Sequence, residues 1–408
     1  MANINKELIL INVQGEDKPG VTAALTKILA DHNVDILDIG QATIHNDLGL
    51  GILFSIPKSE ETSPVLKDLL FKAYELGMNI KFNPILPKDY EKWVSQHGKE
   101  RNIVTLMARR LQGSHLAKVT SIISEQGLNI DKITRLSGRR SLKTDNGNTI
   151  SVVELSVRGV PKDVDKLKRD FLKVSKESEV DIAFQEDNIY RRNRRLVCFD
   201  MDSTLIQTEV IDELARRAGV YEKVSAITEA AMRGELDFKQ SFEKRIALLK
   251  GLDESVMKEV ADNLPLTEGA ERLFRSLKKY GYKTAILSGG FTYFGNYLKT
   301  KLDIDYVFAN ELEVENGKLT GRHVGDIVDG SKKAEMLKLL AFKEDIHLEQ
   351  VIAVGDGAND LPMIQLAGLG IAFHAKPKVK ATAQHAISVN GLDTILYLIG
   401  LRESEIVK

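Results

Sequence analysis

Three short apolar runs, each ending in a polar or glycine motif, constrain the fold of this chain most. Each run has the length of a fully buried strand, and residues 271–279 and 332–341 have the apolar spacing of helices. Alternating strands and helices predict a parallel α/β sheet, in which the carboxyl ends of the strands meet at one edge. The runs are Leu196–Phe199 before Asp200, Thr284–Leu287 before Ser288, and Val351–Val354 before Gly355.

The side chains that collect at this edge suit phosphoryl transfer. Asp200 and Asp202 follow the first run, although Asp is also a common turn residue and a plain turn is the structural alternative. Carboxylate oxygens suit Mg²⁺, which keeps waters for a substrate phosphate. Ser288 and the amides after it can donate hydrogen bonds to phosphoryl oxygens, and Lys333 offers a positive charge. With a third carboxylate, Asp356, the combination indicates Mg²⁺-dependent phosphoryl transfer.

The order and spacing of these motifs are similar to those of the haloacid dehalogenase superfamily. Lys333 matches the remaining motif of that superfamily, and the adjacent Lys332 is the alternative. The resemblance implies a Rossmann-like parallel-sheet core over residues 187–408, with a small helical cap over residues 209–264. The three motifs are Asp200-Met201-Asp202-Ser203-Thr204, Ser288-Gly289-Gly290 and Gly355-Asp356-Gly357-Ala358-Asn359-Asp360.

From Asp200 onward the chain resembles, more narrowly, the phosphoserine phosphatase family. Glu209 follows the first motif at the distance usual in that family, and Arg245 matches its cap arginine. Taken singly, a helix Glu or Arg is usually a solvated charge. Together, an acid and a fork-shaped cation complement the ammonium and carboxylate of O-phosphoserine. We therefore expect hydrolysis of O-phospho-L-serine to L-serine and phosphate, the last step of serine biosynthesis.

The resemblance also implies a role for each residue of the site. Asp200 is expected to attack phosphorus and form an aspartyl-phosphate. Asp202 is expected to protonate the departing serine oxygen and later to deprotonate the attacking water. The expected substrate-binding residues are Glu209, Arg245, Ser288, Gly289, Lys333 and Asn359; the expected Mg²⁺ ligands are Asp200, the backbone carbonyl of Asp202 and Asp356, with Asp360 as support.

Two other functions compete with this interpretation. The first is another small-molecule phosphatase or phosphotransferase of the same superfamily. Because Asp202 is an acid where the ATPase branch has threonine, hydrolysis or transfer to an alcohol is favoured. The second is a non-catalytic amino-acid sensor with a vestigial phosphatase half. None of the expected catalytic positions is missing from the sequence, which argues against the sensor.

The first half of the chain contains an internal repeat. A shift of 94 positions lays residues 21–36 over residues 115–130. Each copy reads strand, helix, strand, strand, helix, strand, which predicts two ferredoxin-like α+β domains, 1–90 and 98–186. The predicted segments are Leu8–Val13, Val21–Ala30, Ile36–Ile44 and Leu50–Ile56, then Ile103–Met107, His115–Glu125, Ile130–Leu136, Thr149–Val157 and a charged helix near 162–173.

The first strand-to-helix turn, residues 15–21, resembles the loop of ACT domains, which bind amino acids in many metabolic enzymes. The backbone freedom of Gly20 and a helix start suit a ligand carboxylate, so Asp17 and Gly20 are candidate ligands for a serine effector. An ordinary turn is the alternative. The second copy has Gln112-Gly113-Ser114-His115 and lacks Pro-Gly, which weakens the expectation of a site there. Domains of this kind resemble pairing units, so we expect a homodimer.

The composition of the chain limits the kinds of binding partner and cellular compartment that we expect. Lys and Arg number 57 against 58 Asp and Glu, so no overall field attracts nucleic acid or an anionic membrane. The basic run Tyr190–Arg195 lacks interleaved aromatic residues and is interpreted as a solvated linker. The single cysteine, Cys198, excludes an intramolecular disulfide and fits a reducing compartment. With neither a signal peptide nor a membrane span in the sequence, we expect a cytoplasmic protein.

Overall fold

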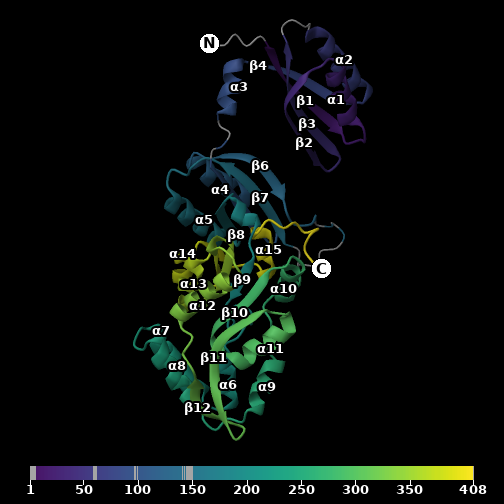
Figure 1. The fold of residues 1–408 in the computed structure, drawn as a ribbon. Helices are drawn as coiled ribbons and strands as arrows, with labels where there is room; N and C mark the ends of the chain where they lie inside the picture. Colours follow the sequence, from purple (N-terminus) through teal and green to yellow (C-terminus); the bar gives the residue numbers. More distant parts are fainter. Residues whose placement is uncertain are drawn as a thin grey trace. The chain divides into compact units, whose positions relative to one another are not determined.

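The computed structural model describes residues 6–57, 62–95, 98, 100–139, 141, 143 and 150–407. The chain folds as two compact units, Met1–Lys99 and Glu100–Lys408. Figure 1 shows their elements. In the described parts of the chain, no helix is long and apolar enough to cross a membrane.

The first unit is a four-stranded antiparallel sheet with the strand order β2-β3-β1-β4. Alternate β1 residues Ile9, Ile11 and Val13 are buried together with the apolar stripe of helix α1. Side chains alternate between the two faces of a strand and recur on one face of a helix every three to four residues, so each element has one apolar face. The unit therefore has its own core. Its elements are β1 (Lys6–Glu16), α1 (Val21–Asp31), β2 (Asp35–Ile44), β3 (Asp47–Pro57), α2 (Thr62–Glu75), β4 (Asn79–Ile85) and α3 (Pro87–Val94).

The second unit begins with a module of the same topology, with the strand order β6-β7-β5-β8. The predicted repeat and its ferredoxin-like plan are thus confirmed. Thr149, the predicted start of the third strand, lies outside the described residues. The elements are β5 (Arg101–Ala108), α4 (Gly113–Glu125), β6 (Asn129–Arg135), β7 (Ser151–Arg158), α5 (Val164–Ser178) and β8 (Asp181–Glu186).

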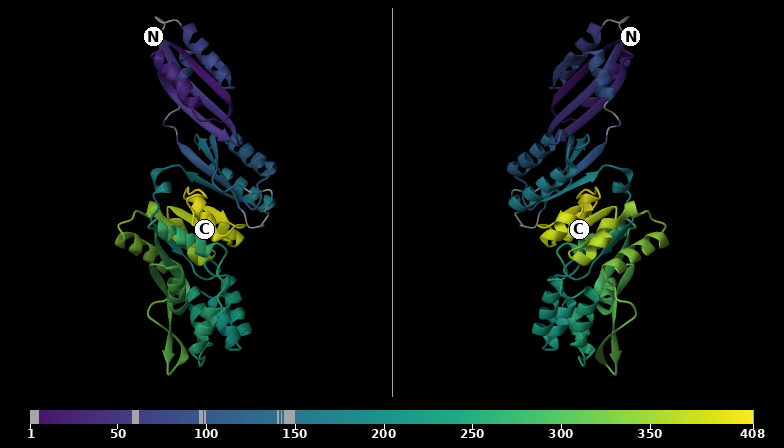
Figure 2. Two further views of the ribbon diagram at one scale, coloured as in Figure 1. Left: turned by 90° about the vertical axis from the view of Figure 1, so that its right-hand side faces the viewer. Right: turned by 90° about the vertical axis from the view of Figure 1, so that its left-hand side faces the viewer.

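The rest of the second unit is built on a seven-stranded sheet with the order β12-β11-β10-β9-β13-β14-β15. All neighbouring strands pair in parallel except β11 and β12. This is the predicted α/β core (Figure 2). Its strands are β9 (Leu196–Phe199), β10 (Lys283–Phe291), β11 (Tyr306–Glu315), β12 (Lys318–Val324), β13 (Val351–Gly355), β14 (Leu369–Phe373) and β15 (His385–Ile387).

Helices cover this sheet and form an insertion between β9 and β10. Four short helices occupy residues 210–262, where the sequence predicted several. The long β11–β12 hairpin, which the sequence analysis did not predict, packs against one of them, α8. The helices are η1 (Ile189–Arg192), α6 (Val210–Arg217), α7 (Tyr221–Met232), α8 (Phe238–Ala247), α9 (Ser255–Asp262), α10 (Ala270–Lys279), α11 (Thr292–Leu302), α12 (Gly330–Lys343), η2 (Leu348–Gln350), η3 (Ala358–Asp360), α13 (Leu361–Leu366), α14 (Pro377–Thr382), η4 (Leu392–Thr394) and α15 (Ile395–Leu398).

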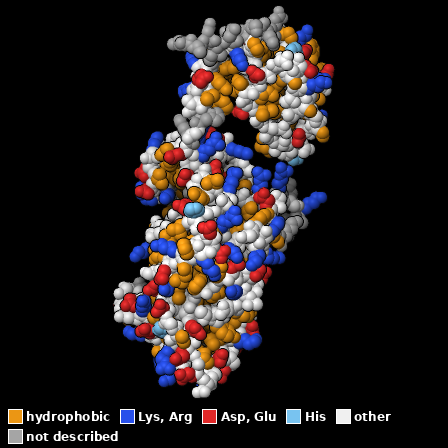
Figure 3. Space-filling view, viewed as in Figure 1, with side chains coloured by type: hydrophobic (Ala, Val, Ile, Leu, Met, Phe, Trp, Pro, Cys, Tyr) orange, Lys and Arg blue, Asp and Glu red, His pale blue; other side chains and the backbone are white. Residues whose placement is uncertain are grey.

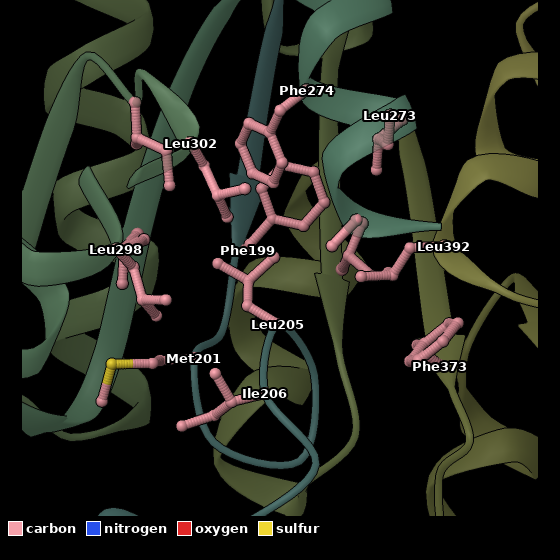
Figure 4. Close-up of a cluster of buried hydrophobic side chains, with 14 of the residues drawn as sticks. Phe199, Met201, Leu205, Ile206, Leu273, Phe274, Leu298, Leu302, Phe373 and Leu392 are labelled. Carbon is pink, nitrogen blue, oxygen red and sulfur yellow. The ribbon is translucent and has the colours of Figure 1, made fainter. Parts of the chain in front are cut away.

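The loop after β9 is anchored by buried apolar side chains (Figure 4). Phe199 packs against Phe274 with ring centroids 5.0 Å apart. Met201, Leu205 and Ile206 are fully buried in the same cluster. Because these side chains enter the core, the polar residues between them are held in fixed positions at the end of the strand.

Hydrogen bonds join the second ferredoxin-like module to the α/β part of the same unit. The Asp181 carboxylate, at the start of β8, accepts hydrogen bonds from the backbone N–H groups of Ser388, Val389 and Asn390 at 2.6, 3.2 and 3.1 Å. The Asn390 side chain donates another at 2.7 Å. These four protein donors supply hydrogen bonds that the buried carboxylate cannot receive from water. These two parts are therefore joined by buried polar contacts.

The basic run Tyr190–Arg195 connects these parts, but the prediction that it is solvated is wrong in two places. Arg191 is 1% exposed and pairs with Glu154 of β7. Arg194 is 7% exposed and donates to the carbonyls of Glu349 and Gly368. An arginine can be buried when distant residues supply its hydrogen-bond partners. The local sequence does not reveal such partners, which is why the prediction failed here.

Candidate active site

The two acidic residues after β9 face different partners. The backbone N–H of Asp200 donates to the Val354 carbonyl at 2.8 Å, which fixes it beside the end of β13. Asp200 Oδ1 accepts a hydrogen bond from Lys333 Nζ at 2.8 Å. Asp202 Oδ1 accepts one from the backbone N–H of Val210 at 2.8 Å. Both carboxylates are buried, so the pair is asymmetric in its surroundings.

A cluster of three carboxylates stands at the predicted sheet edge. Oxygens of Asp200, Asp356 and Asp360 lie within 4.8 Å of one another. Lys333, fully buried on α12, donates to Asp200 and, at 2.6 Å, to Asp360. The neighbouring Lys332 instead pairs with Glu335 on the surface at 3.0 Å. The structure thus places Lys333, rather than Lys332, in the cluster.

The partners of Asp360 suit the supporting role expected of it. Its Oδ2 accepts the backbone N–H groups of Asp356 and Gly357 at 3.1 and 2.9 Å, while its Oδ1 accepts from Lys333. Both oxygens are therefore engaged by the protein. Asp356 accepts from the Thr204 hydroxyl at 3.2 Å through Oδ1. Asn359 lies beside Gly357 and the start of α12.

The electrostatics of the cluster fit a divalent cation. Burial raises the pKa of Asp356 to about 8, with the negative charges of Asp200, Asp360 and Glu209 adding to it. Burial alone would lower the pKa of Lys333, but Asp200 and Asp360 raise it above the usual value. One lysine thus faces three carboxylates, and the uncompensated negative charge with all-oxygen donors suits Mg²⁺. The described side chains fit the ion.

We expect Mg²⁺ to stabilise the protein more near pH 8 than near pH 5.5. Because the pKa of Asp356 is raised on folding, the folded state binds more protons in this window and the metal-free protein loses stability as pH rises. Mg²⁺ needs ionised carboxylates, so protons compete with it at the lower pH. Thermal unfolding with and without Mg²⁺ at both pH values measures this. Equal shifts at the two values, or a shift retained in Asp356→Asn, would contradict it.

The Ser288-Gly289-Gly290 motif forms the last part of β10 and packs tightly on the acidic loop. A Cβ at Gly290 would collide with Asp202 Oδ2, and a Cβ at Gly289 would lie 2.9 Å from Phe238 of α8. Glycine is therefore required for this close approach. The Ser288 hydroxyl is buried and accepts from the Gly290 N–H at 2.9 Å. These contacts bring the second motif against Asp202.

Asp202 is in surroundings that favour its protonated form. Burial raises its pKa well above the usual value, and the negative charges of Glu209 and Asp200 add to the effect. A carboxyl with a raised pKa is suited to carry the proton that a general acid donates. Asp200 and Asp202 are thereby differentiated: one is fixed by a lysine, and the other is biased toward carrying a proton.

The charges of Glu209 and Arg245, which lie far apart in the sequence, interact with each other. Glu209 stands at the start of α6 and accepts from the Ser203 hydroxyl at 2.8 Å. Glu209 is exposed as a whole residue, but burial of its carboxyl group among neighbouring atoms raises the pKa of that group. Burial lowers the pKa of Arg245, while Glu209, Asp212 and Asp202 oppose this shift. The helical insertion therefore supplies one acid and one cation near Asp202.

The structure adds site residues that the sequence analysis did not assign. Asn310 of β11 donates to the Gly289 carbonyl at 2.8 Å and accepts from the Val328 N–H at 2.8 Å, so it holds the second motif. Phe238 lies over Gly289. Thr204 belongs to the first motif, and its hydroxyl could have been noticed there. Asn310 and Phe238 lie in no motif, and no local pattern marks them.

The candidate effector loop of the first unit borders a cavity of about 460 Å³. Asp17 and Gly20 line it together with Thr22, Gln41 and neighbouring residues. Gly20 has a φ of 95° and begins α1 without a side-chain cap. At the corresponding start of α4, the Gln112 N–H donates to His115 Nδ1 at 3.3 Å. No side chain caps the first N–H groups of α1, so they can donate to a ligand.

Comparison with known proteins first defines the class. Residues 7–83 match the ACT domain family, and residues 197–365 match the haloacid dehalogenase-like hydrolase family. A crystal structure of a haloacid dehalogenase family hydrolase from Salmonella enterica serovar Typhi has 32% identity and a TM-score of 0.63, and the match covers 73% of this chain and 99% of that chain. The fold is that of a haloacid dehalogenase-like hydrolase with an ACT domain.

Full-length relatives then narrow the family. A phosphoserine phosphatase of Mycobacterium tuberculosis is 39% identical over 402 residues, which cover 98% of this chain and 95% of that protein. A phosphoserine phosphatase of Streptomyces coelicolor is 38% identical over 98% of this chain and 93% of its own length. A probable phosphoserine phosphatase from Vibrio cholerae, unliganded, has 34% identity and a TM-score of 0.58 over 73% of this chain and 86% of its own. The chain belongs to the phosphoserine phosphatase family.

Proposed function

We propose that this protein hydrolyses O-phospho-L-serine to L-serine and phosphate with Mg²⁺ as cofactor. One observation carries the proposal: Asp200, Asp356, Asp360 and Lys333 converge at one sheet edge, next to a carboxyl, Asp202, whose pKa is raised. The names of the full-length relatives support the same substrate. The product places the reaction at the end of serine biosynthesis.

We infer a separate task for each acid from its surroundings. An Asp200 oxygen attacks phosphorus, the bond from phosphorus to the serine oxygen breaks, and Asp202 gives its proton to that oxygen. Water then attacks the aspartyl-phosphate, Asp202 takes the proton of the water, and phosphate leaves. Ser288, Gly289 and Lys333 would donate to the phosphoryl oxygens. Bound Mg²⁺, held by Asp200, Asp356 and the Asp202 carbonyl, would neutralise phosphoryl charge.

A substrate panel tests the function. Phosphate release from L-phosphoserine should depend on added Mg²⁺ and exceed release from phosphothreonine and phosphohomoserine. Comparable rates on all three would favour a broader phosphatase of the same superfamily. Absence of Mg²⁺-dependent release from every phosphate ester would favour the sensor interpretation instead.

Replacing Arg245 by alanine should weaken phosphoserine selectively. We expect kcat/KM for phosphoserine to fall about 10- to 100-fold, the size of a charge-assisted hydrogen bond to the substrate carboxylate. Hydrolysis of p-nitrophenyl phosphate, which lacks that carboxylate, should change little. Steady-state kinetics on both substrates measure the difference, and Lys244→Ala on the exposed side of α8 is the matched control. Equal losses on both substrates would refute carboxylate binding.

The first ferredoxin-like domain is proposed to bind L-serine at the Asp17–Gly20 loop. The cavity and the uncapped start of α1 support this role. Calorimetry of the full-length protein should show saturable serine binding that Gly20→Ala weakens, since alanine rarely adopts a φ of 95°. Gly113→Ala at the start of α4 is the control. Identical isotherms for the wild type and Gly20→Ala would count against the site. A homodimer and a cytoplasmic location stay predictions.

A further inference from the structure

A second cavity, of about 660 Å³, lies between the second ferredoxin-like module and the α/β part of the same unit. Strands β5, β6 and β7 contribute one side, and the connecting helix η1 and the segment 399–405 contribute the other. This connection is the basic run that the catalytic function leaves unused. The cationic residues of its lining are Arg101, Lys132, Arg191, Arg192 and Arg402.

This interdomain cavity carries a local excess of positive charge on a molecule with balanced charge. Five cationic side chains line it against three carboxylates, a surplus of two. Figure 3 shows side chains of both signs on one face of the molecule, as expected from the balanced composition. Ile103, Leu136 and Ile399 add buried apolar surface. Cations beside apolar walls are the chemistry of a site for an organic anion.

Arg191 is the most informative residue of the cavity wall. It is 1% exposed, and its Nη2 donates to Glu154. Among the described residues, its Nε and Nη1 have no hydrogen-bond partner. A buried guanidinium with two unsatisfied nitrogens is costly, because the charge has left water without full compensation. An anion in the cavity would add negative charge close to this guanidinium.

This cavity is distinct from the candidate active site. Arg191 and Arg192 precede β9, whereas Asp200 follows its other end. A four-residue strand separates the two ends by about 13 Å. The sheet therefore stands between the basic cavity and the carboxylate cluster, and an anion bound in the cavity would contact the connection that leads into β9.

We propose that the interdomain cavity binds a small phosphate-bearing anion. A phosphate monoester carries a charge of about −1.5 to −2 at neutral pH, which matches the surplus of two. The planar fork of arginine binds phosphate in a bidentate manner, and the apolar wall accommodates an organic group. Free phosphate and an organic phosphate share this chemistry, and the size of the cavity favours the organic phosphate.

Calorimetry on the full-length protein without Mg²⁺ tests the proposal, with inorganic phosphate and adenosine monophosphate as probes. We expect saturable binding of at least one probe, weakened about tenfold or more in Lys132→Glu/Arg192→Glu. Both substituted residues are exposed at the cavity, so the fold should survive. Lys338→Glu/Lys343→Glu, at two exposed positions of α12, makes the same two charge reversals elsewhere and should bind like the wild type.

The two probes distinguish free phosphate from an organic phosphate as the anion that the cavity binds. Binding of inorganic phosphate alone identifies free phosphate, and tighter binding of the nucleotide identifies an organic phosphate. No saturable binding of either probe, or binding unchanged in the double variant, overturns the proposal. If the double variant unfolds by circular dichroism, Arg192→Gln gives the same comparison. This experiment measures binding and not turnover. A negative binding result would therefore not contradict the proposed phosphatase function, and a negative turnover result would not contradict anion binding in the cavity.

Discussion

Asp200→Asn should abolish phosphoserine turnover. The substitution keeps the shape of the side chain but removes the negative oxygen that attacks phosphorus. We expect kcat to fall by about four orders of magnitude or more, the usual cost of removing a catalytic nucleophile. Acid-labile phosphoenzyme, trapped by rapid quenching with labelled substrate, should disappear with the turnover. Substantial remaining turnover would refute the assignment of Asp200.

Asp345→Asn is the matched control for this experiment. It makes the same chemical change at an exposed residue with a φ of 53°, a conformation that asparagine adopts readily. Its turnover should equal that of the wild type. Circular dichroism of both variants shows whether Asp200→Asn is folded, so that lost activity can be attributed to chemistry.

Lys333→Met should cost both activity and stability. Methionine keeps the length of the side chain but leaves Asp200 and Asp360 buried without their cation. Breaking a buried ion pair costs about 3–5 kcal/mol, which lowers the unfolding temperature of a domain of this size by roughly 10 °C. The pKa of Lys333 is raised, so its stabilising contribution is fully present at neutral pH. Thermal unfolding near pH 7.5 measures the loss.

The neighbouring lysine provides the control for Lys333→Met. Lys332 forms a partly exposed ion pair with Glu335, worth less than about 0.5 kcal/mol, so Lys332→Met should unfold like the wild type. The penalty in Lys333→Met should also shrink as pH falls, because the unpaired carboxylates then take up protons. Equal stability of the two variants would show that the buried lysine is not needed to balance the cluster.

Much of the fold could be predicted because its elements follow local periodicity. The run Leu196–Phe199 coincides with β9, and residues 271–279 and 332–341 fall within α10 and α12. The β11–β12 hairpin escaped prediction. Residues 306–315 of β11 combine half-buried apolar and polar positions without a clear period, since this strand lies near one edge of the sheet and its hairpin partner β12 packs against α8.

Residues of the candidate site that belong to a sequence motif could be predicted. Residues that reach the site only through tertiary packing could not. Motif order placed Asp200, Ser288 and Asp356 at one sheet edge. Phe238 and Asn310 act on the second motif through contacts with Gly289, and neither has a pattern of its own. Their positions depend on how an inserted helix and a neighbouring strand pack, which no window of sequence contains.

The sequence by itself determined the class of the protein, the repeat and the residues of the acidic edge, because strand and helix periods and motif order are local properties of the chain. Tertiary structure decided between Lys332 and Lys333, and it differentiated Asp200 from Asp202. It also showed that Arg191 is buried. The reason is physical: Lys333 reaches Asp200 across 133 residues, and the burial and charge that shift a pKa come from such distant neighbours.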